Sequence, residues 1–409
     1  MQFRPYQEEI IKKGTEVITR YSFLYLAMEV RTGKTLTSFG IANNLKVQSV
    51  LFITKKKAIS SIKNDYALLK PDYQCEVINY ESLHKLSGLL VDLIVVDEAH
   101  SLGAFPKPSK RAKMVRDLIS INNCYVILLS GTPTPESFSQ MYHQVYGIKN
   151  NPFNSFKNFY RFARTYVRLK TKHINSFPVM DYSDGMKTIL DAMKPYTIAY
   201  SQKEAGFKVK TEETVLEVDM NNSTYVVANM LKKNRVVQGE GETILADTPV
   251  KLMMKLHQLY SGTIIFESGN SSVLDYSKAE FIAEKFGHLK IGIFYKFKEE
   301  LKALKHIYED RLTTELEDFD STDKSIALQI VSGREGISLR KADCLIYYNI
   351  DFSATSYWQS RDRMTTKNTL LNKVYWIFSK NGIEKNIYKA VTNKKDYTLS
   401  HFKKDLLSL

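Results

Sequence analysis

The sequence has few of the residues that mark fibrous, disulfide-bonded or low-complexity proteins. Its 409 residues include only 18 glycines, 10 prolines and 3 cysteines. So little glycine and proline excludes a collagen-like or low-complexity chain. Cys75, Cys124 and Cys344 are too scattered for a disulfide framework or a CxxC-type zinc site, and this usage fits a reducing, cytosol-like compartment. What remains is an ordinary globular composition over a length that allows two or three domains.

Long apolar runs and acidic residues are also scarce. No stretch of about 18 apolar residues occurs, and the opening MQFRPYQEEI carries charges where a signal peptide needs an apolar segment. We therefore expect a protein of the cytoplasm with no membrane partner. The 58 Lys and Arg exceed the 44 Asp and Glu, which leaves a net charge of +14. Residues 101–175 hold 12 of the cations and 2 of the acids, which predicts a basic face and a polyanionic partner such as nucleic acid.

Short apolar runs separated by amphipathic stretches indicate alternating strands and helices. Continuous apolarity within the runs is typical of parallel sheets covered on both faces. The predicted strands are Phe23–Met28, Val50–Thr54, Glu76–Asn79, Leu93–Val96, Tyr125–Ser130, Thr263–Phe266, Lys290–Phe294, Ile326–Val331, Cys344–Tyr348 and Val374–Phe378. We expect an α/β fold of two tandem lobes, each a mostly parallel sheet with helices on both faces. Residues 1–150 would form the first lobe, 151–250 a helical and basic connecting region, and 251–409 the second lobe.

The first predicted strand leads into a phosphate-binding pattern. Met28 is followed by Glu29-Val30-Arg31-Thr32-Gly33-Lys34-Thr35 and then by a helix-compatible stretch. This is the second half of a P-loop, with Met28 in place of the first glycine. Such a turn presents backbone N–H groups and a helix N-terminus to phosphate oxygens, Lys34 supplies a cation to the β and γ phosphates, and the Thr35 hydroxyl is a ligand for Mg²⁺.

Two further motifs follow later strands. Asp97-Glu98-Ala99-His100 follows Leu93–Val96, and Ser130-Gly131-Thr132-Pro133 ends the next predicted strand. An ATPase needs such an acidic pair, because Asp97 would hold the Mg²⁺ that bridges the phosphates while Glu98 polarises the attacking water. A solvated turn is the simpler alternative, and the P-loop upstream argues against it. The hydroxyls of the second motif are suited to sense the state of the phosphates.

The order of these motifs, with a glutamine near the start, resembles that of superfamily 2 helicases. The resemblance implies that Arg4 and Gln7 of Arg4-Pro5-Tyr6-Gln7 read the adenine, and that Thr32 and Gly33 contact the nucleotide with Lys34 and Thr35. It also implies a set of nucleic-acid contacts in the first lobe, namely Thr54, Lys55, Lys56, Lys57, Tyr80 and Thr132.

The resemblance continues in the second lobe. Lys290–Phe294 resembles motif IV, Val331–Leu339 motif V and Gln359–Arg363 motif VI. It implies that Ser332, Gly333 and Arg334 contact nucleic acid, that Gln359 contacts the nucleotide, and that Arg363 is a catalytic arginine finger acting with Lys34 and Glu98. Thr366 stands where the family has a second arginine, and Arg361 and Lys367 are the alternatives to Arg363 as the arginine finger.

Lys251–Leu259 and Asp343–Trp358 resemble the corresponding segments of Swi/Snf-type translocases, which also occur as compact bacteriophage versions. The resemblance implies two RecA-like lobes, ATP and Mg²⁺ as cofactors, and duplex or branched DNA as a partner bound with little sequence preference. It implies a DNA helicase or translocase for replication, recombination or repair, with proteins of those processes as partners and with no need for more than a monomer. A viral protein of this kind would act in the bacterial host cytoplasm.

Two other functions stay open: a DEAH-type RNA helicase, and an ATP-switched DNA clamp without motor activity. The basic and aromatic segment Phe156–Arg164 also has two interpretations. Its rings are expected to form one apolar stripe of the core, which leaves a solvated or phosphate-facing side. That side consists of Lys157, Arg161, Arg164 and Arg168.

Overall fold

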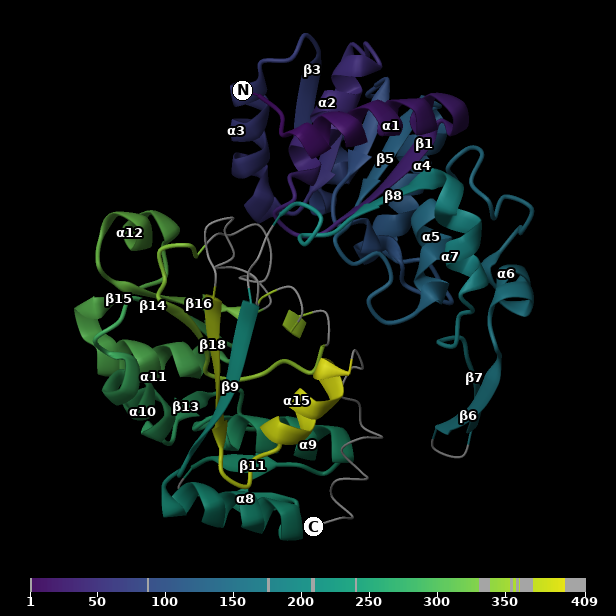
Figure 1. Ribbon diagram of the computed structural model, residues 1–409. Helices are drawn as coiled ribbons and strands as arrows, with labels where there is room; N and C mark the ends of the chain where they lie inside the picture. Colours follow the sequence, from purple (N-terminus) through teal and green to yellow (C-terminus); the bar gives the residue numbers. More distant parts are fainter. Residues whose placement is uncertain are drawn as a thin grey trace. The chain divides into compact units, whose positions relative to one another are not determined.

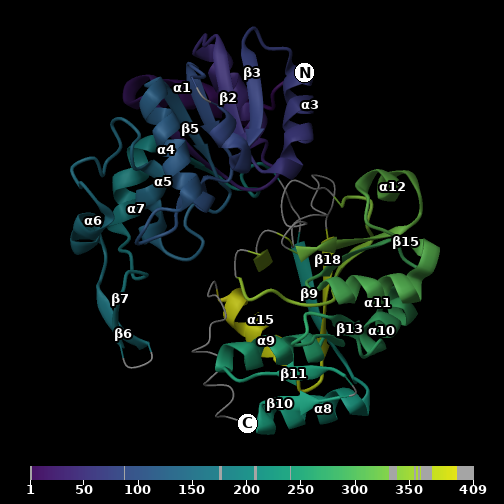
Figure 2. The same cartoon turned by 180° about the vertical axis from the view of Figure 1, so that it is seen from behind.

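The computed structural model describes residues 2–86, 88–174, 177–206, 210–239, 241–330, 339–353, 356–357, 360 and 371–393. The chain divides into two compact units, Met1–Phe207 (unit 1) and Lys208–Leu409 (unit 2). Each is built around its own sheet, as Figures 1 and 2 show from opposite sides. Among the helices that the structure describes, none has the length and apolarity needed to cross a bilayer.

Unit 1 contains a six-stranded sheet in the order β3-β2-β4-β5-β1-β8, with every pair parallel. Its strands are β1 Phe23–Met28, β2 Ser49–Thr54, β3 Gln74–Asn79, β4 Leu93–Val96, β5 Tyr125–Leu129 and β8 Thr197–Tyr200. The helices are α1 Pro5–Tyr21, α2 Lys34–Asn44, α3 Ile59–Leu69, α4 Lys110–Asn122, α5 Met141–Val145, α6 Phe159–Tyr166 and α7 Thr188–Met193. A separate antiparallel hairpin joins β6 Lys170–Ile174 to β7 Phe177–Asp181.

Successive side chains of these strands enter two different cores. In β1, Phe23 and Tyr25 pack with α4 to α7, whereas Leu24, Leu26 and Met28 pack with α1, α2 and α3. Because successive residues of a strand point to opposite faces of the sheet, a continuously apolar strand buries both of its faces. This explains why β1, β2, β4 and β5 are apolar along almost their whole length, unlike the edge strand β3.

Unit 2 repeats the plan with the order β15-β16-β14-β17-β18-β9, again all parallel. Its strands are β9 Lys210–Val218, β14 Ile291–Tyr295, β15 Leu312–Thr313, β16 Ser325–Gln329, β17 Cys344–Tyr347 and β18 Leu371–Ser379. The helices are α8 Asn222–Asn234, α9 Pro249–Leu259, α10 Ser277–Phe286, α11 Lys298–Tyr308, α12 Leu316–Ser321 and α15 Glu384–Thr392. Two small antiparallel pairs add β10 Val236–Gln238 with β11 Thr243–Leu245, and β12 Thr263–Ile265 with β13 Ser271–Val273.

The predicted fold class is confirmed, since both units are parallel sheets with helices on both faces. One strand assignment was wrong in its placement: Thr263–Phe266 does form β12, but this strand pairs antiparallel with β13 outside the large sheet. Residues 151–250, expected to be helical, also supply an edge strand to each sheet. These are β8 and β9, and β9 (Lys-Thr-Glu-Glu-Thr-Val-Leu-Glu-Val) has charged residues and threonines in most of its positions, which hides it from a search for continuous apolar runs.

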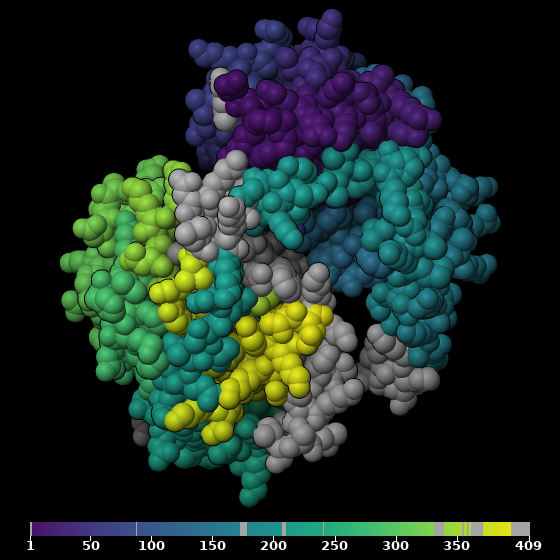
Figure 3. Space-filling view, in the orientation of Figure 1, coloured from purple at the N-terminus to yellow at the C-terminus, as the bar shows by residue number. Residues whose placement is uncertain are grey.

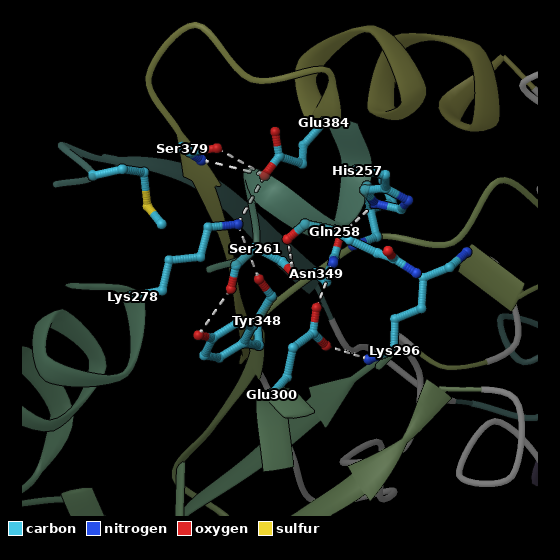
Figure 4. A network of polar contacts seen from close by, with 12 residues as sticks. His257, Gln258, Ser261, Lys278, Lys296, Glu300, Tyr348, Asn349, Ser379 and Glu384 are labelled. Atoms are coloured by element: carbon cyan, nitrogen blue, oxygen red, sulfur yellow. Dashed lines mark hydrogen bonds and ion pairs between the residues drawn. The ribbon is translucent and has the colours of Figure 1, made fainter. Parts of the chain in front are cut away.

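A buried polar network lies among the helices and strand ends of unit 2 (Figure 4). Lys278 of α10 and Glu384 of α15 are both fully buried, with 2.8 Å between Nζ and Oε1. Asn349, just after β17, donates a hydrogen bond to the carboxylate of Glu300. Burial raises the pKa of Glu300. Asn349 also contacts His257, whose burial lowers its pKa. These contacts join four helices to the end of β17 and so fix the chain that leads toward the predicted motif VI.

Candidate nucleotide-binding site

The predicted P-loop lies between β1 and α2. Thr32 is buried, and its hydroxyl donates a 2.8 Å hydrogen bond to the carbonyl of Glu29, which tightens the turn. Gly33 has φ of +83° and is the N-cap of α2, so Lys34 and Thr35 begin the helix. The first turn of a helix has N–H groups without intrahelical partners. This turn therefore has the geometry of an anion site with a cation beside it.

Gln7 packs directly against this loop. Its side chain is 3% exposed, Nε2 donates to the carbonyl of Gly33 over 3.3 Å, and Oε1 accepts from the backbone N–H of Arg4 over 3.0 Å. A Cβ at Gly33 would lie 2.4 Å from Nε2 of Gln7, so only glycine fits there. Tyr6 adds a hydrogen bond from its hydroxyl to the carbonyl of Thr32. Besides its predicted role with adenine, the glutamine motif thus holds the phosphate loop.

The acidic pair follows β4, next to the P-loop in the same unit. Asp97 is 8% exposed, and Oδ2 accepts a 2.9 Å hydrogen bond from the hydroxyl of Thr54. Burial and then the charge of Glu98 raise the pKa of Asp97 to about 6, while the charge of Lys34 acts in the opposite direction. Because β1, β5 and β4 are neighbouring parallel strands, the P-loop and the acidic pair lie at the same edge of the sheet.

Glu98 is held by the motif that follows β5. Its backbone has φ of +52°, and its Oε2 lies 3.3 Å from Nδ1 of His100. The same ring nitrogen lies 3.0 Å from Oγ of Ser130, which also accepts from the backbone N–H of Thr132. His100 is therefore a link between the acid that would polarise water and the Ser-Gly-Thr-Pro turn. Among the described residues, the buried hydroxyl of Thr132 has no hydrogen-bond partner.

The structure places two of the predicted nucleic-acid contacts inside the protein. Thr54 is fully buried, and Tyr80, 1% exposed, donates its hydroxyl hydrogen to the backbone carbonyl of Asp97. Both support the acidic pair. Lys56 and Lys57 are exposed and Lys55 is half-buried, immediately after β2 at the same end of the sheet. These lysines are accessible to a backbone phosphate.

Gln202 contacts the P-loop, although no motif in the sequence predicts this role. Its Nε2 donates to the carbonyl of Val30 over 2.8 Å, and its backbone N–H donates to a carboxylate oxygen of Glu29 over 2.7 Å. The backbone N–H of Glu29 in turn donates to the carbonyl of Tyr200 at the end of β8. The phosphate loop is thereby attached to residues 200–202, just before the chain leaves unit 1.

The site residues predicted in the second lobe lie outside the described residues. They are Ser332, Gly333, Arg334, Gln359 and Arg363, together with Arg361, Thr366 and Lys367. Their roles stay predictions.

The oxygen groups of the P-loop and acidic pair fit a Mg²⁺ ion that arrives with a nucleotide. Mg²⁺ prefers oxygen ligands and usually keeps one or two protein carboxylates together with phosphates and waters. Asp97 provides such a carboxylate, and Thr35 begins the adjacent helix. Among the described residues there is no cluster of three or more His, Cys, Asp or Glu able to hold a metal.

The fold and this geometry define a P-loop α/β protein with an acidic pair beside the phosphate loop. A family model described as the SNF2-related domain matches residues 24–262. The chain belongs to the SNF2-related domain family, as the sequence resemblance predicted.

The sequence identities to individual known proteins are low. Protein CHROMATIN REMODELING 4 of Arabidopsis thaliana is 21% identical over 327 residues, which are 70% of this chain and 14% of that relative. A Sulfolobus solfataricus SWI2/SNF2 ATPase core in complex with dsDNA is 16% identical with a TM-score of 0.43, covering 99% of this chain and 92% of that one. The S. solfataricus SWI2/SNF2 ATPase core domain is 18% identical with a TM-score of 0.41, covering 96% and 89%.

Proposed function

We propose that the protein is an ATP-dependent motor that moves along or remodels duplex or branched DNA. The observation that carries the proposal is the position of two motifs on one parallel sheet: the P-loop follows β1 and the buried Asp97 follows β4, so both lie at the carboxyl-terminal edge of that sheet. A buried carboxylate next to a phosphate-binding helix N-terminus is the arrangement that nucleotide hydrolysis needs. Membership of the SNF2-related domain family supports the same assignment.

Each residue of the site has a role in this proposal. Thr35 and Asp97 would hold Mg²⁺, which neutralises charge on the phosphates, while Lys34 would contact the β and γ phosphates. Glu98 would take a proton from the attacking water, and His100 positions its carboxylate through the 3.3 Å contact. Arg363 from the second lobe would stabilise the transition state, with Gln359 at the nucleotide.

DNA is the proposed partner because of charge and position. The chain carries a net charge of +14, and Lys56 and Lys57 are exposed at the strand ends beside the nucleotide site. The name of the Arabidopsis relative, a chromatin remodelling protein, is in line with this partner. Such phosphate contacts position a protein without reading sequence. Replication, recombination or repair is the proposed setting.

The test is ATP hydrolysis with duplex DNA, forked DNA, single-stranded DNA or RNA added. Duplex or forked DNA is expected to stimulate turnover, and Lys34→Ala and Glu98→Gln to abolish it, whereas Lys46→Ala, on the surface after α2, is the matched control. Stimulation by RNA alone would instead identify an RNA helicase. ATP-dependent retention on DNA without any turnover would identify a clamp. Either result overturns the motor assignment.

A further inference from the structure

A second basic surface lies on and around α6, away from the P-loop and the acidic pair. Residues 137–180 contain no Asp or Glu but seven Lys or Arg. Four of these cations follow at intervals of four, three and four residues through α6 and its flanks, and all four are exposed. They are Lys157, Arg161, Arg164 and Arg168, and we call them the α6 basic face. Because residues three and four apart lie on one side of a helix, Arg161 and Arg164 project from the same side.

The opposite side of α6 fixes this face in place. Phe159 is 2% exposed, and Phe162 and Ala163 are fully buried in the core beneath the sheet. Phe162 packs against the rings of Phe153 and Tyr142 with centroid separations of 5.0 and 4.8 Å. The predicted stripe of Phe156, Phe159 or Tyr160, and Ala163 is confirmed for Phe159 and Ala163, whereas Phe156 is half-buried and Tyr160 is exposed. A rigidly packed helix presents its cations with little ordering cost on binding.

The α6 basic face has almost no neutralising partner. None of its four side chains forms a hydrogen bond or ion pair with any residue that the structure describes. One acid, Asp184, interacts electrostatically with a member of this face. Its pKa is lowered mainly by a hydrogen bond with Lys170 and further by the charge of Arg168. In Figures 1 and 2, α6 and the β6–β7 hairpin extend from the body of unit 1, and the space-filling view places the segment at the outer margin of that unit (Figure 3).

We infer that the α6 basic face binds the phosphate backbone of duplex DNA, as an accessory contact separate from the strand-end lysines Lys55–Lys57. The inference rests on the proposed function for the choice of DNA. Proteins that hold single strands combine cations with exposed rings on which bases stack. Here Phe159 and Phe162 face in, and the one exposed ring of α6, Tyr160 at 44% exposed, packs edge-on against Phe159 and Tyr182. Four exposed cations with a single, partly packed ring suit the phosphates of an intact duplex, whose bases are already stacked. Such a contact would hold the protein on DNA between steps without sequence preference.

The test is binding of a short labelled duplex to the full chain, without nucleotide, in a salt series from about 50 to 200 mM. Arg161→Glu/Arg164→Glu is compared with Lys302→Glu/Lys305→Glu, an equally exposed pair with the same three-residue spacing on α11. The α6 pair is expected to weaken duplex binding roughly tenfold or more at the lowest salt and to reduce the salt slope by about 2. Arg161→Lys/Arg164→Lys should keep most of the affinity, and far-UV circular dichroism should show all variants folded.

Each of the following results would overturn the inference: unchanged duplex binding by the α6 reversal, an equal loss in the α11 control, or a loss confined to single-stranded DNA. Loss of binding only to an acidic protein or anionic vesicle would also overturn it. The binding assay needs no hydrolysis, so its outcome is separate from that of the motor. If DNA stimulates ATP turnover but the α6 reversal binds normally, the motor assignment stands and this surface is not a DNA contact. If the reversal weakens duplex binding but DNA does not stimulate ATP turnover, this surface is a DNA contact and the motor assignment fails.

Discussion

The hydroxyl of Thr54 donates a hydrogen bond to Oδ2 of Asp97, joining the ends of two neighbouring parallel strands, β2 and β4. The bond favours the ionised carboxylate. In Thr54→Val the donor is lost, so the pKa of Asp97 should rise further and its affinity for Mg²⁺ should fall. We expect the Mg²⁺ concentration for half-maximal ATP hydrolysis to increase several-fold, whereas Thr54→Ser, which keeps the donor, should resemble the wild type. A Mg²⁺ requirement unchanged in Thr54→Val would contradict this role.

The raised pKa of Asp97 predicts a pH-dependent cost in the metal-free protein. The pKa of Asp97 is about 6 in the folded protein and 3.8 in its reference state, which stands for the unfolded chain. Between pH 3.8 and pH 6 the folded protein therefore binds more protons than the unfolded chain. The contribution of Asp97 to stability is therefore most favourable at acidic pH and is lost as the pH rises through 6. Asp97→Asn removes the ionisable group, so at pH 8 in EDTA it should stabilise the protein by on the order of 2 kcal/mol.

The measurement is urea unfolding of the wild type and Asp97→Asn at pH 8 and at pH 4.5. The stabilisation should be largest at pH 8 and reduced to about a third at pH 4.5, where the unfolded carboxyl is still mostly ionised and the folded one is protonated. Asp117→Asn, at a side chain that is 62% exposed, is the control and should show no such pH dependence. If Asp97→Asn is less stable than the wild type at pH 8, the carboxylate is stabilised by its surroundings and the sign given above is wrong.

Gly33 is predicted to tolerate no side chain. Gly33→Ala would strain a backbone at φ of +83° and place Cβ 2.4 Å from Gln7, which must move from its bonds to the loop. We expect loss of nucleotide binding, measured by fluorescence of a labelled ATP analogue, and destabilisation of about 1 to 3 kcal/mol. Gly269→Ala is the matched control, since Gly269 has φ of +90° but nothing within 4 Å of its would-be Cβ. Equal effects would show that backbone strain alone is responsible.

The buried pair Lys278 and Glu384 is predicted to affect the free energy of unfolding mainly through the neutralisation of one charge by the other. Lys278→Met leaves a fully buried carboxylate without its cation and should cost about 3 to 5 kcal/mol of unfolding free energy. Lys278→Met/Glu384→Met removes both charges and should recover most of that loss. The exposed pair Lys380 and Asp219 provides the control, because Lys380→Met should change stability little. Urea unfolding distinguishes these cases, and a double variant as unstable as the single one would contradict the argument.

The sequence predicted those parts of the fold whose signal is local. β1 and β4 were placed to the residue, because strands buried on both faces are continuously apolar and end in polar motifs. The sheet to which β12 belongs could not be predicted in this way, because the partner of a strand depends on contacts outside the strand's own sequence. β9 was missed because an edge strand with one solvated face does not need to be apolar throughout.

Within the site, residue types and order were sufficient to find the P-loop and the acidic pair. The positions of supporting residues were not predictable. Thr54 precedes a lysine run and reads as part of a surface, yet its alternation in β2 turns its side chain into the protein toward Asp97. Gln202 has no motif around it, and only the parallel pairing of β8 with β1 brings it to Val30.

The attachment of Gln202 to Glu29 and Val30 has a mechanical consequence. Residues 200–202 belong to the single stretch of backbone by which unit 1 continues into unit 2. A pulling force transmitted along the chain from the second unit would therefore act on hydrogen bonds that hold the P-loop. Load on the polypeptide and a bound triphosphate would then act on the same few peptide groups.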